Sequence, residues 1–464
     1  MNNIVGNTEW NGLPMPRRLR AIVAVAFGVS VSVLDSVSQC RPADAGCRVR
    51  DIVRQLGVDR NAYQLALITT LLIFSNLGDI VGYRRIYIFG LLLFTAASAG
   101  CALLRRVSPR LSCGAPCRVW VPQPSRASIR HLIRVIYPRR MLGRGMSINA
   151  TVVAVSSVAG PSVAAAILSV TSWHWLFAVN LPVGAVAFVL SRRFLPQNPV
   201  RVEGRRFDWR SGVMCALTFG LVMSCVEGYS HGMSLQAWLP MAAVAAFVAW
   251  RFVTDQLRRQ MPILPFDLLR IPIFSLSIVT SICSFTAQML AMVALPFILQ
   301  HSMGYDAVST GLIFTAWPMV IMVVAPVAGV LSEHIHAGYL GLGGLLVMTF
   351  GLVMLGLLPA SPSDFDIIWR LVVCGMGFGL FQSPNNSIMI ASAPQHRSGS
   401  ASGMLASARL VGQTLGGGAC GFFFHWHDGE TTMTPLFVAA AFSLFGAVLS
   451  ASRIHLHSAR GPEA

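Results

Sequence analysis

The sequence contains no lysine and few charged residues of any kind: Asp, Glu and Arg together make up 11% of its 464 residues. Soluble domains carry about 25% charged residues, whereas 54% of this chain is hydrophobic and its mean hydropathy is +0.63. Because this apolar surface exceeds what one folded core can hide, the composition indicates that the chain lies in lipid. It also excludes a disulfide scaffold, a coiled coil and a disordered chain.

Sequence patterns that would assign other functions are also missing. The ten cysteines form no paired C-x-x-C zinc pattern. His425, His427 and Asp428 lack a further ligand nearby in the sequence, so we expect no metal site. There is no Gly-Lys-Ser/Thr phosphate loop, which excludes an ATP-driven pump within this chain, and we expect no cofactor. The polar segment before Arg20 and the absence of a small-residue cleavage site argue against a cleaved signal peptide.

Apolar segments of membrane-spanning length recur along the whole chain. A helix needs about 20 apolar residues to cross a hydrocarbon core of roughly 30 Å. The thirteen segments that reach this scale lie near 21–38, 62–79, 86–104, 147–168, 174–191, 212–229, 235–253, 273–299, 309–331, 338–358, 366–390, 401–424 and 434–452. The sequence therefore predicts an all-α polytopic membrane protein whose first partner is the lipid bilayer.

All 35 basic residues are arginine, and the formal net charge is +17. Arginines flank alternate links between the predicted spans, whereas the links near 171, 231, 302, 361 and 429 carry none. Because positively charged links stay in the cytoplasm, this alternation predicts cytoplasmic N- and C-termini. It also explains the charge without a nucleic acid partner.

Two arginine-rich stretches break this pattern. Residues 36–60 carry five arginines in a link that should be external, and residues 105–134 carry seven more. Arginine at the centre of a membrane helix costs roughly 2.5 to 3.5 kcal/mol, so we expect that the second stretch does not cross as a helix. The later arginine pattern nevertheless requires a crossing there, which implies fourteen spans with the fourth degenerate. Compensating frame slips would explain both stretches, and a non-transporting remnant is therefore one alternative.

A loop motif follows the second apolar segment. Leu77, Asp79, Gly82 and Arg84 match the motif Gly-x-Leu-Ala-Asp-Arg-x-Gly-Arg-Lys, and Arg85 follows as a second basic residue. This segment resembles the cytoplasmic gating loop of the major facilitator superfamily. A carboxylate at a helix end can meet arginine and the positive N-terminus of a neighbouring helix, which gives a latch that makes and breaks. The alternative interpretation is that the two arginines only anchor the topology.

Two further motifs extend the resemblance. Gly160 and Pro161 resemble the fifth-helix antiporter motif Gly-x-x-x-Gly-Pro-x-x-Gly-Gly, in which small residues pack tightly and proline bends the helix. Gly329 and Glu333 repeat the Gly-x-Leu-x-acid core of the loop motif in the second half, as expected of two related bundles. Residues 173–184 resemble the sixth-helix signature of the fourteen-helix drug:proton antiporter branch. That branch's fourth-helix motif, Arg-x-x-Gln-Gly, is absent between 105 and 134.

Polar residues inside the apolar segments are candidates for the transport path. Asp35 stands where this branch carries an acid on its first helix, and the resemblance implies a proton-coupling carboxylate. The alternative is an interfacial Asp that faces external water. In the second half, polar groups at membrane depth are tolerated where they line a cavity, or where they bond between helices, which we favour for the two asparagines. These candidates are Gln382, Asn385, Asn386, Arg409 and Gln413.

The resemblance implies the major facilitator fold, with two six-helix bundles and an extra helix pair. The expected parts are an N-terminus (1–20), a first bundle (21–191), the extra pair with its links (192–272), a second bundle (273–452) and a tail (453–464). It further implies a monomer in the bacterial inner membrane that is not an enzyme. We expect it to export drugs or other small hydrophobic or cationic compounds against protons, by alternating access. A facilitator of a specific metabolite is the other alternative.

Overall fold

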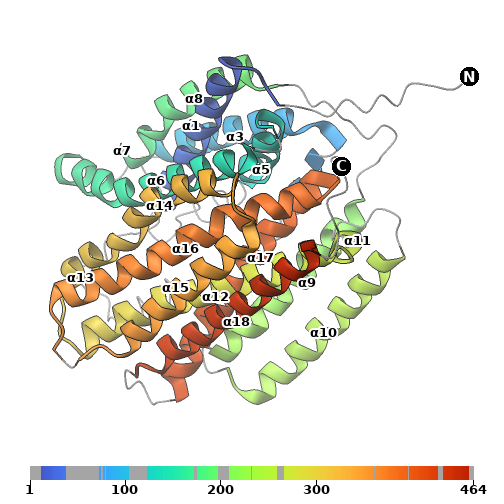
Figure 1. Cartoon of the computed structure of the whole chain (residues 1–464). Coiled ribbons are helices and arrows are strands. Elements are labelled where there is room, and N and C mark those ends of the chain that lie inside the picture. Colours follow the sequence, from blue (N-terminus) through green and yellow to red (C-terminus); the bar gives the residue numbers. More distant parts are fainter. Residues whose placement is uncertain are drawn as a thin grey trace, which may run out of the picture.

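The structure is a computed structural model of the chain. It describes residues 12–37, 73–74, 77–78, 80–103, 123–138, 141–171, 175–196, 208–230, 233–258, 266–359, 361–394, 397–426 and 432–458. Throughout these ranges the regular secondary structure is helical and contains no strand (Figure 1). The expected all-α fold is therefore confirmed.

The helices follow the predicted apolar segments in order. In the first half they are α1 (Arg17–Val37), α3 (Tyr83–Leu103), α5 (Gln123–Ile136), α6 (Leu142–Val170), α7 (Trp175–Ala178) and α8 (Asn180–Phe194). The middle of the chain forms α9 (Trp209–Ser230), α10 (Leu235–Leu257) and α11 (Phe266–Leu269). The second half forms α12 (Pro272–His301), α13 (Ala307–Phe314), α14 (Ala316–Leu331), α15 (Ala337–Gly356), α16 (Asp364–Ser392), α17 (Ser398–Trp426) and α18 (Thr434–Ser458). Most of the predicted span 62–79 and of the stretch 36–60 lies outside the described residues.

Several of these helices have the length and composition of membrane spans. Five described segments meet both criteria: Leu235–Leu257, Pro272–His301, Val308–Leu331, Ala337–Gly356 and Thr434–Ile454. Their outward faces carry large apolar side chains such as Phe247, Val323 and Phe445, all of which are exposed. An apolar outer surface of this extent is unfavourable in water and is expected where lipid is the solvent.

The helices are arranged as two bundles (Figure 1). In the first, α1 packs on α6 and α8, and α3 packs on α5 and α8, around a core that includes Tyr87 and Ile133. In the second, α15 packs on α16 and α18, and α12 packs on α17 and α18, around a core that includes Leu290 and Phe378. The pair α9 and α10 lies beside the second bundle, where α9 contacts α17.

Side-chain caps set the start of three helices in the second bundle. Asp306 accepts hydrogen bonds from the backbone N–H groups of Val308 (3.0 Å) and Ser309 (3.3 Å) at the start of α13. These caps satisfy N–H groups that the helix leaves without partners. The hydrogen bonds from Ser309 lower the pKa of the Asp306 carboxyl. Ser363 caps α16 and His336 caps α15 in the same way.

The stretch 105–134, which we expected not to cross as a helix, is described only from residue 123 onward. There α5 begins at Gln123 and packs within the first bundle. Ile129 and Ile133 lie in the core of the first bundle, whereas Arg130 and Arg134 donate to carbonyl oxygens of the second bundle. An amphipathic helix of this kind tolerates arginine because protein, rather than lipid, covers the polar face. With 14 residues, α5 is about 21 Å long, which is shorter than a full crossing.

Candidate functional site

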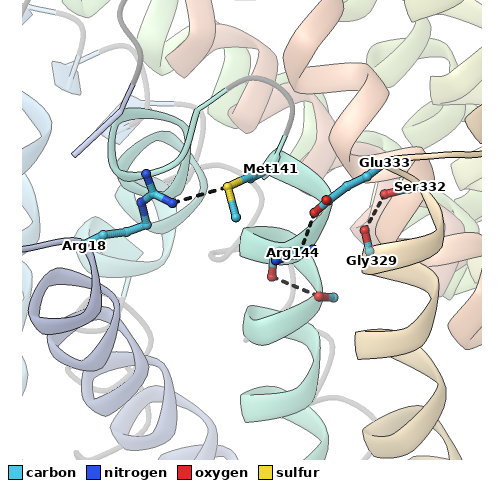
Figure 2. Close-up of polar contacts among 7 residues, drawn as sticks. Arg18, Met141, Arg144, Gly329, Ser332 and Glu333 are labelled. Atoms are coloured by element: carbon cyan, nitrogen blue, oxygen red, sulfur yellow. Dashed lines mark hydrogen bonds and ion pairs between the residues drawn. The ribbon is translucent and has the colours of Figure 1, made fainter. Parts of the chain in front are cut away.

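The two bundles meet where the start of α6 crosses the end of α14. A Cβ atom added to Gly329 would lie 2.3 Å from Ser147 Oγ and 2.8 Å from the carbonyl oxygen of Gly143. A Cβ added to Gly143 would lie 2.1 Å from Ser332 Oγ and 2.7 Å from the carbonyl oxygen of Gly329. The two serine hydroxyls bond back to their own helices, to Arg144 O and Gly329 O (Figure 2). Small residues on both sides thus bring the two backbones into direct contact.

An ion pair lies beside this crossing. Arg144 Nε lies 2.6 Å from Glu333 Oε1, and the side chains are 41% and 15% exposed (Figure 2). Glu333 lies two residues after the end of α14, where the negative end of that helix dipole disfavours an acid. It faces the first turn of α6, where the positive end of the dipole favours one. A part-exposed pair of this kind contributes about 0.2 to 1 kcal/mol. A contact of this strength can break at a small cost in free energy.

Helix α5 adds two further contacts between the bundles. Arg134 Nη2 donates to the carbonyl oxygen of Ala393 after α16, at 2.8 Å. Arg130 Nη1 donates to the carbonyl oxygen of Ser402 on α17, at 3.4 Å. Both lie toward the C-terminal end of α5, which is the end that leads into α6 and the Arg144–Glu333 pair. These three contacts close the bundles against each other on one side.

The N-terminal segment is attached to this same end of the molecule. The guanidinium of Arg18 donates from Nε to the carbonyl oxygen of Leu13 at 2.9 Å, and its Nη1 lies 3.3 Å from Met141 Sδ, just before α6 (Figure 2). We predicted this end to be cytoplasmic, and the N-terminus of α1, the start of α6 and the end of α14 share it. That this end of the molecule lies in the cytoplasm stays a prediction.

The loop motif after the second predicted span is partly described. Gly82 has a φ of +105°, which only glycine adopts without strain, and it separates helical residues 80–81 from α3. The guanidinium of Arg84 donates to the carbonyl oxygen of Arg192 in the last turn of α8, and Arg85 is exposed. Leu77 is half-buried, and Asp79 lies outside the described residues. The pairing expected for that acid therefore stays a prediction.

The remaining first-bundle candidates lie on α1 and α6. Asp35 belongs to the last turn of α1, which ends at Val37, and its side chain lies outside the described part. Gly160 is buried in α6, and the helix continues through Pro161 to Val170. The proton-coupling role of Asp35 and the sealing role of the Gly160–Pro161 motif stay predictions.

Asn385 lies in a buried polar network inside the second bundle. Its Nδ2 donates to Ser281 Oγ at 2.7 Å, and its Oδ1 accepts from Arg453 Nη1 at 2.6 Å. Arg453, 1% exposed, also donates to Ser277 Oγ (2.9 Å) and Ser450 Oγ (2.6 Å). The network joins α12, α16 and α18, which is the interhelical bonding favoured for this residue from the sequence.

The other second-bundle candidates are half-buried: Gln382 and Asn386 on α16, and Arg409 and Gln413 on α17. Asn386 precedes Ile390 by one helical turn, and Ile390 packs in the core of the first bundle, so this face of α16 is directed at the first bundle. Within the described part of the chain, no group of three or more His, Cys, Asp or Glu could hold a metal. His427 and Asp428 lie outside it.

Sequence reasoning missed the partner of Glu333 and the contacts that the basic residues of α5 make. Glu333 was predicted as a gating residue without its partner Arg144, and Arg130 and Arg134 were counted only as part of an aberrant stretch. The internal repeat contained information that could have identified the partner of Glu333. If Glu333 repeats the loop motif, its arginine partner should stand at the start of the span that faces it, and Arg144 is such a residue.

Comparison with known proteins places this geometry in a family. Residues 61–417 match the family model described as Major Facilitator Superfamily. The chain is 48% identical over 454 residues to "Uncharacterized transporter YebQ" of Escherichia coli (strain K12), which covers 96% of this chain and 97% of that protein. It is 26% identical to "Riboflavin transporter RibZ" of Clostridioides difficile (strain 630), over 88% of this chain and 89% of that protein.

Two more distant similarities agree with this assignment. The chain is 25% identical to "Multidrug resistance protein Stp" of Mycobacterium tuberculosis (strain CDC 1551 / Oshkosh), over 86% of this chain and 74% of that protein. The crystal structure of the human organic anion transporter MFSD10 (TETRAN) superposes with a TM-score of 0.70 at 14% identity, over 94% of this chain and 100% of that one, and supports the fold alone.

The two bundles, the closely packed crossing between them and these similarities give one conclusion. The protein is a multi-pass membrane transporter for small molecules and not an enzyme. The chain belongs to the major facilitator superfamily.

Proposed function

We propose that this chain is a proton-coupled secondary transporter of the fourteen-helix drug:proton antiporter branch, which exports drugs or other small hydrophobic compounds by alternating access. The observation that carries the proposal is the close contact between the bundles, formed by the Gly143–Gly329 crossing and the Arg144–Glu333 ion pair. Alternating access requires a contact at one end that holds in one state and breaks in the other. A weak ion pair on a close-packed crossing has these properties.

The extra helix pair supports the branch. Between the bundles, α9 and α10 supply two long helices, and α10 buries little of its surface against the rest of the described chain. A pair that lies at the side of the second bundle can be present without taking part in the transport path. One of the relatives named above is a multidrug resistance protein, which agrees with drugs as substrates.

In this proposal the first bundle carries the proton. Asp35 lies in the last turn of α1. A carboxylate within a membrane span costs free energy, and such a residue is by default assigned a function. Protonation would neutralise the carboxylate, so that proton and substrate bind alternately. Asp79 and Arg84 would gate at the cytoplasmic face, together with Glu333. The proposed orientation has both termini in the cytoplasm of a bacterium.

Transport into inverted vesicles tests this function. With a pH gradient, we expect accumulation of a drug identified by a resistance panel in an efflux-deficient host, and Asp35→Asn should remove the part of that accumulation driven by the gradient. The amide cannot release a proton, whereas Asp35→Glu keeps a titratable group and should retain it in part. Equal gradient-driven accumulation by parent and Asp35→Asn proteins would contradict the proton role.

Charge reversal tests the latch. Arg144→Glu places two acids at the crossing, and like charges at this separation should lower transport about tenfold, which corresponds to roughly 1.4 kcal/mol. The double variant Arg144→Glu/Glu333→Arg restores the pair and also suits both helix dipoles, so most of the rate should return. If the double variant is no better than the single one, the two residues do not act on each other.

A facilitator of one metabolite is the second candidate, favoured by the similarity to a riboflavin transporter. The two candidates differ in measurable ways. An exporter of drugs raises resistance to several unrelated compounds, whereas a facilitator changes the uptake of one metabolite and is independent of a proton gradient. A resistance panel and a metabolite uptake screen on the same strain distinguish them.

A further inference from the structure

Exposed arginines gather where α1 begins and α8 ends. Arg17 and Arg20 lie in the first turn of α1, and Arg192 and Arg193 lie in the last turn of α8. The two helices pack side by side in the first bundle (Figure 1). Neither turn contains an acid, and none of these four guanidinium groups forms an ion pair with a described residue. We call these four residues the α1–α8 basic surface.

The exposed arginines of α10 are different, because they have an acid nearby. Arg251 and Arg258 lie within about one helical turn of Asp255. Glu9 and Glu203, the acids nearest in sequence to the α1–α8 basic surface, lie outside the described residues. Positive charge is therefore balanced locally on α10, whereas the described part of the chain does not balance it on the α1–α8 basic surface.

Phe194 brings one arginine from each helix to the same place. The guanidinium carbons of Arg20 and Arg193 each lie 5.7 Å from the centre of the Phe194 ring. Twice that distance, about 11 Å, is the upper limit for the separation of the two charges, and like charges repel at this range. Contact with a ring uses the face of a guanidinium and leaves the N–H groups at its edge available. An anion bound to both groups would relieve the repulsion.

An exposed apolar face continues from each of these two arginines. On α1, Val23 and Phe27 follow Arg20 by three and seven residues, and both are exposed. On α8, Val189 is exposed and precedes Arg193 by four residues. Such spacings place residues on one face of a helix, and seven residues extend about 10 Å, which is within one leaflet of a hydrocarbon core of roughly 30 Å. The two faces thus form a surface with a cationic end and an apolar body.

We propose that the α1–α8 basic surface binds one anionic phospholipid, whose phosphate lies between Arg20 and Arg193 and whose acyl chains lie along the exposed faces of α1 and α8. Guanidinium groups bind phosphate through charge-assisted hydrogen bonds, and the apolar faces match the acyl chains. The lipid joins the first and last helices of the first bundle, so its binding stabilises that bundle. This surface lies apart from the contact between the bundles and does not depend on what is transported.

Lipid titration of the full-length protein in detergent tests this binding. The dissociation constant of the first bound lipid is measured by native mass spectrometry for dioleoylphosphatidylglycerol, which is anionic, and for dioleoylphosphatidylcholine, which is zwitterionic and has the same chains. We expect phosphatidylglycerol to bind at least about tenfold more tightly. Glycerol 3-phosphate, which has an anionic phosphate but no acyl chains, should displace the lipid only at a concentration about 100-fold higher than that of free phosphatidylglycerol.

Substitution of the arginines separates this surface from general attraction to positive charge. Arg20→Gln and Arg193→Gln should each weaken phosphatidylglycerol binding about fivefold, and together about 25-fold, while phosphatidylcholine binding stays within about twofold. The double variant Arg251→Gln/Arg258→Gln removes two exposed charges from α10 and is the matched control. It should bind both lipids within about twofold of the parent. The melting temperature of each variant in lipid-free detergent reports any loss of folding.

Four results would overturn the proposal. Equal binding of the two lipids by the parent shows that the negative charge is not recognised. Equal losses in the Arg20/Arg193 and Arg251/Arg258 double variants assign the effect to total charge. Equal loss of both lipids, together with a lower melting temperature, assigns the two arginines to folding. Displacement by glycerol 3-phosphate at the same concentration as the lipid identifies a site for free phosphate rather than a lipid surface.

Discussion

Gly329→Leu should reduce the transport rate about 100-fold. This corresponds to a destabilisation of roughly 2.7 kcal/mol of the state in which α6 and α14 are in contact. Already the first carbon of a side chain at Gly329 would lie 2.3 Å from Ser147 Oγ and 2.8 Å from a backbone oxygen of α6. The backbone oxygen cannot rotate away, so α6 and α14 must separate, and the Arg144–Glu333 pair at 2.6 Å must lengthen with them. Gly329→Ala should give a smaller loss of the same kind.

The measurement combines transport with accessibility. The variant Ser332→Cys is labelled with a membrane-impermeant maleimide, and the labelling of the parent protein is subtracted as background. The rate of labelling at position 332 should be higher when Gly329→Leu is also present. Gly343→Leu is the matched control, because a Cβ at Gly343 on α15 meets no atom within 4 Å. A closed-state role for the crossing is refuted if both leucine variants transport equally well, or if maleimide reacts at the same rate with and without leucine at 329.

Arg453→Met should destabilise the second bundle by roughly 2 to 4 kcal/mol. Arg453 is 1% exposed and donates to Asn385 Oδ1 at 2.6 Å, Ser277 Oγ at 2.9 Å and Ser450 Oγ at 2.6 Å. Methionine fills much of the volume but donates nothing, so three acceptors on three helices lose their donor in a dry interior. Interhelical hydrogen bonds in membranes average only about 0.6 kcal/mol each, but those to a charged donor are worth more.

Reversible unfolding of the purified protein in detergent measures this loss. Arg453→Lys retains the charge but places all its N–H donors on one nitrogen, so its stability should lie between those of the parent and the Met variant. Arg258→Met, at the exposed end of α10, controls for loss of positive charge alone. If the Arg453→Met protein unfolds at the same denaturant concentration as the parent, the network does not contribute a stabilisation of this size.

The two predictions concern different parts of the mechanism. The crossing of α6 and α14 decides how the bundles meet, whereas the Arg453 network holds α12, α16 and α18 as one unit. In the proposed mechanism, a rigid second bundle would let a local contact at Glu333 move the whole half of the molecule. Loss of the network should therefore lower stability first, and loss of the crossing should lower transport in a protein that still folds.

Periodicity and length were sufficient to locate most helices. The long apolar segments after residue 272 agree with α12 to α18, because each must satisfy its own backbone hydrogen bonds inside lipid. For α5 the sequence predicted only that the stretch does not cross as a helix, whereas the structure shows what its arginines meet: Arg130 and Arg134 donate to carbonyl oxygens of the second bundle. Which surface surrounds a polar face depends on its neighbours in space, and these lie some 260 residues away in sequence.

By itself the sequence determined that this chain is a helical membrane protein, and it singled out Glu333, Asn385 and Arg409 as candidate site residues. These properties depend on composition and local spacing. Only the tertiary structure decided the partner of each polar group: Arg144 for Glu333, Arg453 for Asn385, and α17 for Arg130. The physical reason is that a charge in lipid is tolerated only through contacts made across helices, and such contacts arise from packing rather than from the order of residues.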